Sequence, residues 1–126
     1  VLFSIYMATA LHLGRISPPM SGPSLLSIIF YLVLQPVTAG FVEELVWRGY
    51  FIERLLARGF SEWKSIVLSS VSFAFIHGFT VVDKLAVTFM FGLIAGTYYV
   101  RERNLPVLMI SHVVADTVGF GLWLAW

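Results

Sequence analysis

The chain has 126 residues, enough for one compact unit, and its eight basic and seven acidic residues give a formal net charge of +1. Hydrophobic residues make up 59% of it and charged residues only 12%, against roughly 25% charged residues in soluble domains. This composition argues against a water-soluble domain, and no basic run indicates nucleic-acid binding. The lack of cysteine excludes disulfides and thiolate metal sites.

Apolar stretches follow one another along the chain, at residues 1–14, 24–58, 62–79, 84–100 and 105–126. Pro36 predicts a kink or break in the second stretch. Each of the last three is close to the length that crosses the ~30 Å hydrocarbon core of a bilayer at ~1.5 Å per residue. We therefore predict an all-α fold, a polytopic transmembrane helical bundle with about four to five spans.

The connections between these stretches indicate an orientation. Those at 54–64 and 101–104 carry five lysines and arginines, and the other two carry only Arg15 and Lys84. By the positive-inside rule, we expect the 54–64 and 101–104 loops to be cytoplasmic. The chain is already apolar at Val1, so we interpret residues 1–126 as a single membrane-embedded core and a fragment of a longer protein.

The segment FVEELVWRGY, residues 41–50, places Glu43, Glu44 and Arg48 inside an apolar helix. A charge at the centre of a membrane helix costs from ~2.5 kcal/mol upward, so each one needs a partner or a purpose. Glu44 and Arg48 are spaced i, i+4 and can form a buried ion pair, which serves either packing or function. Glu43 lies about 100° round the helix and must find its partner on another helix.

Two histidines are candidate partners for Glu43. Reflection of position 43 through the turn near residues 59–60 lands at 76 or 77, so we expect Glu43 and His77 to lie level. His112, one helical turn before Asp116, lies within about 8 Å of that depth. Two glutamates, two histidines, an arginine and an aspartate on three helices predict a functional site.

Two chemistries fit these residue types. In one, Glu43 is a general base that takes a proton from water, and His112 with Asp116 binds the oxyanion or protonates the leaving amine. In the other, His77, His112, Asp116 and a glutamate bind a divalent metal such as zinc. No serine or threonine stands in a nucleophile signature, which argues against an acyl-enzyme.

The pattern resembles the CPBP family, which comprises type II CAAX prenyl endopeptidases and bacteriocin-processing, abortive-infection-like proteins. That family carries three motifs in order on successive membrane helices. In this chain they read Glu43-Glu44-x-x-x-Arg48, Phe73-x-x-x-His77 and His112-x-x-x-Asp116, and together they span residues 43–116.

The resemblance implies an intramembrane endopeptidase of a prokaryotic cell membrane. Its substrate would be a peptide or protein, either a prenylated CAAX protein or a bacteriocin-type peptide. Glu43 and His77 would activate water, His112 and Asp116 would form the oxyanion site, and a metal-free mechanism is favoured over zinc. Glu44 and Arg48 would support the site.

Position 116 is Asp where the best-understood members use Asn. An ionised Asp cannot donate a hydrogen bond to an oxyanion, so Asp116 is either protonated, or orients His112, or binds metal. A rival hypothesis is a non-catalytic immunity or scaffold protein that uses the polar cluster to hold its helices together. Glu43 discriminates the two, because a scaffold has little use for a second adjacent glutamate.

Overall fold

The structure is a computed structural model that describes residues 2–17, 22–77 and 82–125, so residues 78 and 79 of the expected third stretch lie outside the described residues. The predicted all-α class is confirmed, since these ranges contain helices and no strand. In chain order the helices are α1 (Leu2–His12), α2 (Leu25–Ile29), the π-helix η1 (Phe30–Leu34), α3 (Gln35–Glu44), the π-helix η2 (Leu45–Ile52), α4 (Glu53–Ala57), α5 (Glu62–Ile76), α6 (Val82–Glu102) and α7 (Leu105–Ala125).

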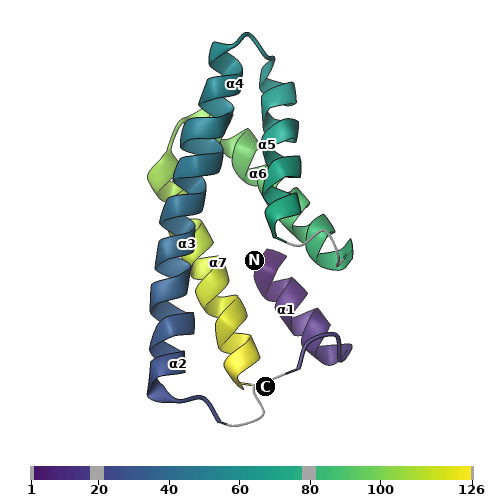
Figure 1. Cartoon of the computed structure of the whole chain (residues 1–126), viewed down its shortest axis with the longest axis vertical. Coiled ribbons are helices and arrows are strands. Elements are labelled where there is room, and N and C mark those ends of the chain that lie inside the picture. Colours follow the sequence, from purple (N-terminus) through teal and green to yellow (C-terminus); the bar gives the residue numbers. More distant parts are fainter. Residues whose placement is uncertain (1, 18–21, 78–81, 126) are drawn as a thin grey trace.

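One helical run of 33 residues, from Leu25 to Ala57, extends along the whole molecule (Figure 1). Pro36 does not break it, because the helix widens into η1 just before the proline, where the N–H of Gln35 donates to the carbonyl of Phe30, five residues back. Proline has no N–H, so the carbonyl of Leu32 lacks its usual helical donor. The hydroxyl of Thr117 on α7 donates to that carbonyl instead, at 3.3 Å.

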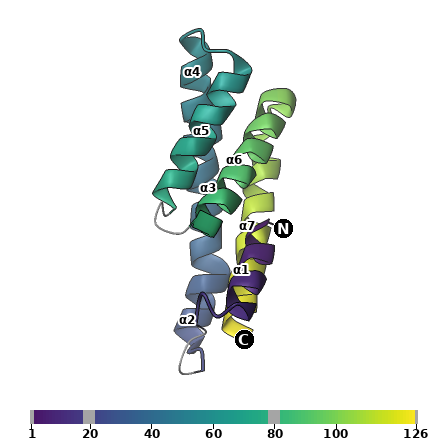
Figure 2. The ribbon, with the colours of Figure 1, turned by 90° about the vertical axis from the view of Figure 1, so that its right-hand side faces the viewer.

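The other helices pack closely against this run and against each other. α5 lies along α6, and α7 lies between α1 and α3 (Figures 1 and 2). A Cβ added at Gly92 of α6 would lie 2.9 Å from the Cα of Ser70, so only glycine permits this approach of α6 to α5. Gly40 serves the same purpose between α3 and α7, where a Cβ would lie 2.7 Å from Cγ2 of Val113.

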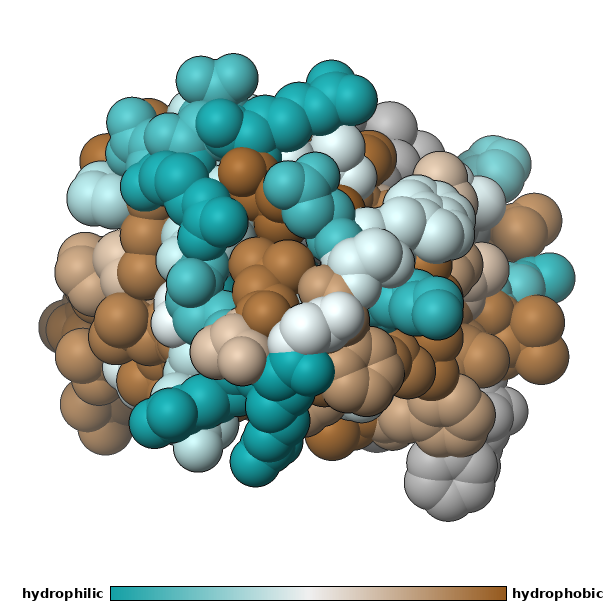
Figure 3. All heavy atoms as spheres, turned by 90° about the horizontal axis from the view of Figure 1, so that it is seen from above, coloured by the Kyte–Doolittle hydropathy of each residue, from teal (hydrophilic) through white to brown (hydrophobic). Residues whose placement is uncertain are grey.

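Charged side chains of the 54–64 and 101–104 loops gather at one end of the bundle. Seen along the long axis, this end shows hydrophilic side chains across its centre (Figure 3). Arg103, in the connection between α6 and α7, forms an ion pair with Glu53 of α4, so the 54–64 and 101–104 loops lie at the same end. The expected topology requires these two loops to lie at the same end.

Two of these helices are long and apolar enough to span a membrane: Leu25–Ala57 and Leu105–Ala125. Large apolar side chains of the first point away from the bundle, with Leu26 80% exposed, Phe30 49% and Val42 52%. Such a surface suits lipid better than water. The expected count of about four to five spans is not confirmed, since α1 has 11 residues and α5 has 15.

Candidate active site

The site is built where α3 passes into η2. Glu43 and Glu44 are the last two residues of α3, and Arg48 lies within η2. α5 ends opposite them and supplies His77, and α7 supplies His112 and Asp116. π-Helical turns occur frequently at functional sites, because the extra residue changes the direction in which side chains point.

Glu44 connects the two sides of the site. Its Oε1 accepts a hydrogen bond from Nη1 of Arg48 at 3.0 Å and lies 2.8 Å from Nδ1 of His112. Glu44 is 0% and Arg48 1% exposed, so this is a fully buried ion pair. The guanidinium of Arg48 also lies over the ring of Phe73, 4.9 Å from its centroid. The predicted i, i+4 pair is therefore present, and its carboxylate also holds a histidine.

In both histidines Nδ1 forms a hydrogen bond, and Nε2 lies near the same atom, Oε2 of Glu43. Nδ1 of His112 donates to the Glu44 carboxylate, and Nδ1 of His77 donates to the carbonyl of Phe73 at 2.7 Å. Both acceptors require a hydrogen on Nδ1, which leaves Nε2 for chemistry. Oε2 of Glu43 lies 3.4 Å from Nε2 of His77 and 3.7 Å from Nε2 of His112.

Oε2 of Glu43 is itself buried, and no described residue forms a hydrogen bond with it. Its two separations from the ring nitrogens exceed the usual hydrogen-bond length of 2.7–3.2 Å. They match a geometry in which a small polar molecule contacts the carboxylate and both imidazoles together.

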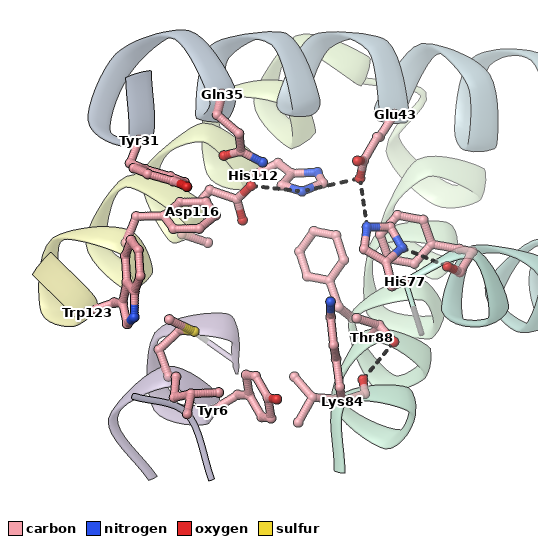
Figure 4. Close-up of a pocket in the computed structure, with 17 residues that line it drawn as sticks. Tyr6, Tyr31, Gln35, Glu43, His77, Lys84, Thr88, His112, Asp116 and Trp123 are labelled. Atoms are coloured by element: carbon pink, nitrogen blue, oxygen red, sulfur yellow. Dashed lines mark hydrogen bonds and ion pairs between the residues drawn. The ribbon is translucent and has the colours of Figure 1, made fainter. Parts of the chain in front are cut away.

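Asp116 completes the row on the α7 side. Its Oδ2 lies 3.8 Å from Nε2 of His112, one turn earlier on the same helix. The polar atoms thus run in the order His77, Glu43, His112, Asp116 along one wall (Figure 4).

This wall faces a cavity of about 430 Å³. α1, α6 and α7 provide apolar surface through Met7, Phe91, Phe120 and Trp123 among others. Gln35, Tyr31 and Lys84 also line it, and sequence reasoning did not single these out as site residues. The signal for Gln35 was available, because it is the only glutamine of the chain and lies inside an apolar run.

A metal requires several donors at one point. In the part of the chain that the structure describes, no group of three or more His, Cys, Asp or Glu side chains is arranged to hold one. The structure brings together the six residues expected from the sequence, namely Glu43, Glu44, Arg48, His77, His112 and Asp116.

A family model described as "Type II CAAX prenyl endopeptidase Rce1-like" matches residues 24–118, about three quarters of the chain. The matched range includes the whole polar row and excludes α1. No curated protein and no solved structure matches the chain significantly.

Proposed function

The chain belongs to the Rce1-like family of type II CAAX prenyl endopeptidases, whose members are integral membrane proteins, and from this premise we propose that it hydrolyses peptide bonds with a water molecule activated by Glu43 and His77. One observation carries the proposal: the buried Oε2 of Glu43 faces Nε2 of both His77 and His112. A water held among these three atoms is next to a carboxylate that can take its proton.

In the first step Glu43 accepts a proton from this water, and the oxygen attacks the carbonyl carbon of the scissile bond. His77 orients the carboxylate by donating from Nε2 when that atom is protonated, and its Nδ1–H donates to the carbonyl of Phe73. Glu43 then passes the proton to the leaving nitrogen as the C–N bond breaks. The products are a carboxylic acid and an amine, so protons balance without a covalent enzyme intermediate.

The oxyanion of the tetrahedral intermediate needs a hydrogen-bond donor. His112 supplies one from Nε2 when that atom is protonated, and the resulting charge is offset by the Glu44 carboxylate at Nδ1. Asp116 supplies a second donor when its carboxyl is protonated. Glu44 and Arg48 support the site and do not touch the reacting atoms.

We propose that the reaction needs no metal. The alternative is a zinc ion held by His77, His112, Asp116 and a glutamate, whose N and O donors suit that ion. Purified protein distinguishes the two. Activity that survives chelation supports the glutamate mechanism, and activity lost on stripping and restored by zinc contradicts it.

The proposed substrate is a peptide or protein at the membrane, with a prenylated CAAX protein as first choice because of the family. The largely apolar lining of the cavity is compatible with a lipid-modified peptide. If the protein instead cleaves an unmodified bacteriocin-type peptide in preference to a prenylated CAAX peptide, the bacteriocin-type peptide is the substrate class. We place the protein in the cell membrane of a prokaryote, with the 54–64 and 101–104 loops in the cytoplasm.

The decisive experiment compares Glu43→Gln with Glu62→Gln in cleavage of a farnesylated CAAX peptide in liposomes. The first change keeps size and removes the base, so we expect loss of turnover with unchanged insertion and melting. The second is the same substitution at an exposed glutamate remote from the cavity, and we expect wild-type rates. Full activity of Glu43→Gln would reject the general-base role and favour the scaffold alternative.

A further inference from the structure

Gln35 is a polar residue of the cavity that the mechanism above does not use. It is the only glutamine of the chain, and the only other side-chain amide is Asn104, in the connection between α6 and α7. It lines the same cavity as Glu43, His112 and Asp116. Its Oε1 is buried and receives no hydrogen bond from any described residue. A buried amide oxygen without a hydrogen-bond donor is unfavourable in apolar surroundings, so its presence there suggests a donor that arrives from outside the chain.

The local backbone directs Gln35 into the cavity. Gln35 follows η1 directly, and its N–H reaches back to the carbonyl of Phe30. Pro36 comes next and is buried, and Thr117 on α7 holds the carbonyl that the proline leaves unpaired. The widened turn is therefore attached to α7. Figure 4 shows Gln35 at the Asp116 end of the polar row, on the opposite side of His112 from His77.

Two other polar side chains of the lining, those of Thr88 and Trp123, have partners within the chain. The hydroxyl of Thr88 donates to the carbonyl of Lys84 at 2.8 Å. Nε1 of Trp123 donates to the carbonyl of Ser17 at 2.9 Å. Gln35 differs from these two because its side-chain oxygen accepts no hydrogen bond from any described residue.

We propose that Gln35 binds the main chain of the substrate, pairing its side-chain amide with a peptide group on the Asp116 side of the scissile bond. This inference rests on the proposed function. A glutamine side chain offers an acceptor and an N–H₂ donor, which complement the N–H and C=O of a peptide group. A peptide that enters an apolar cavity leaves behind the water that satisfied its backbone, and it gains most from a hydrogen-bonding partner there. Gln35 recognises the backbone irrespective of side chains.

The test uses the full protein in liposomes and a farnesylated CAAX peptide, with a series in which each backbone amide near the scissile bond is replaced in turn by an ester. An ester removes one N–H donor. We expect one ester position to lower kcat/KM of the wild type by about tenfold. Gln35→Met should show a similar loss on the parent peptide and no further loss with that ester. The loss should appear in KM, because the bond exists before and during the reaction.

Val37→Met is the matched control, since Val37 lies on the same helix, is 43% exposed and does not line the cavity. It should keep wild-type rates and the full ester penalty. Gln35→Glu keeps the acceptor oxygen and the size, so it should retain the ester penalty even if Gln35→Met melts early.

Three results overturn the inference. One is an undiminished penalty at every ester position in Gln35→Met, and another is loss of the penalty in Gln35→Glu. Either would remove Gln35 from substrate binding while the wild type still cleaves, so the proposed function would stand. A wild type that cleaves no peptide would reject both.

Discussion

Replacing Glu44 by glutamine removes one charge from the buried centre of the site, and we expect it to lower both stability and turnover. Oε1 of Glu44 accepts hydrogen bonds from Nη1 of Arg48 at 3.0 Å and from Nδ1 of His112 at 2.8 Å. The neutral amide would leave the guanidinium of Arg48, 1% exposed, without its counter-charge. Breaking a buried ion pair in this way costs roughly 3–5 kcal/mol in soluble proteins. For a chain of this length that corresponds to a fall in melting temperature on the order of 10–20 °C.

A double variant separates the two roles of Glu44. In Glu44→Gln with Arg48→Met both charges are gone, and replacement of a whole buried pair by neutral groups is often tolerated. We expect the melting temperature to recover most of its loss. Turnover should remain at least about tenfold below that of the wild type, because His112 has lost the carboxylate that orients its ring. Losses of this size are typical when the hydrogen-bond partner that orients a functional histidine is removed.

The measurements are thermal unfolding in detergent and peptide cleavage in liposomes. Glu53→Gln is the control, since it breaks a partly exposed ion pair with Arg103, and such pairs contribute only ~0–1 kcal/mol. A Glu44→Gln variant that melts like the wild type would refute the buried-charge reasoning. A double variant with full activity would show that Glu44 does not position His112.

Three further predictions concern the proposed oxyanion site, the packing and the metal. Asp116 donates a hydrogen bond only while protonated and Asn donates at any pH, so Asp116→Asn should stay active to higher pH than the wild type. Asp116→Ala should lose about 10²–10³ in turnover. The test is the pH–rate profile of each variant, and an Asn variant as inactive as Ala would show that the negative charge is needed. Gly92→Val should destabilise by about 1–3 kcal/mol, because even a Cβ there would meet Ser70 at 2.9 Å, while Gly121→Ala, whose Cβ would come no nearer than 3.8 Å to Leu32, should melt like the wild type. Elemental analysis of active, purified protein should find no stoichiometric zinc; zinc whose removal abolishes turnover, and whose return restores it, would establish a metalloprotease.

The proximity of Glu43 and His77 could be predicted from the sequence. It needed only the rise of a helix and a short connection between two antiparallel helices. The chain does turn there, with Gly59 at φ +83° after α4, and the two side chains come within 3.4 Å. Local geometry likewise predicted the pair of Glu44 with Arg48.

The contact between Glu44 and His112 could not be predicted in this way. These residues are 68 positions apart, and their approach depends on how α3 crosses α7 at Gly40. The direction of Gln35 depends on η1, and a 3.6-residue period does not anticipate a π-helical turn. Hydropathy was sufficient for the fold class. It did not establish the span count, because α5 has 15 residues and would reach only about 22 Å.

The direction of the Glu43 carboxylate depends on the number of residues in the π-helix η2. A π turn holds about one residue more than an α turn, and each residue of an α-helix advances the side-chain direction by about 100°. Deleting one residue within Leu45–Ile52 would let this segment close into an α-helix. Every side chain before the deletion would then rotate by about that angle relative to α4 and α5. Glu43 would keep its chemistry and its neighbours in sequence, yet turn away from both histidines. Homologous chains that share the three motifs but differ by one residue between Arg48 and His77 would therefore need a compensating change in the helix to keep the same site.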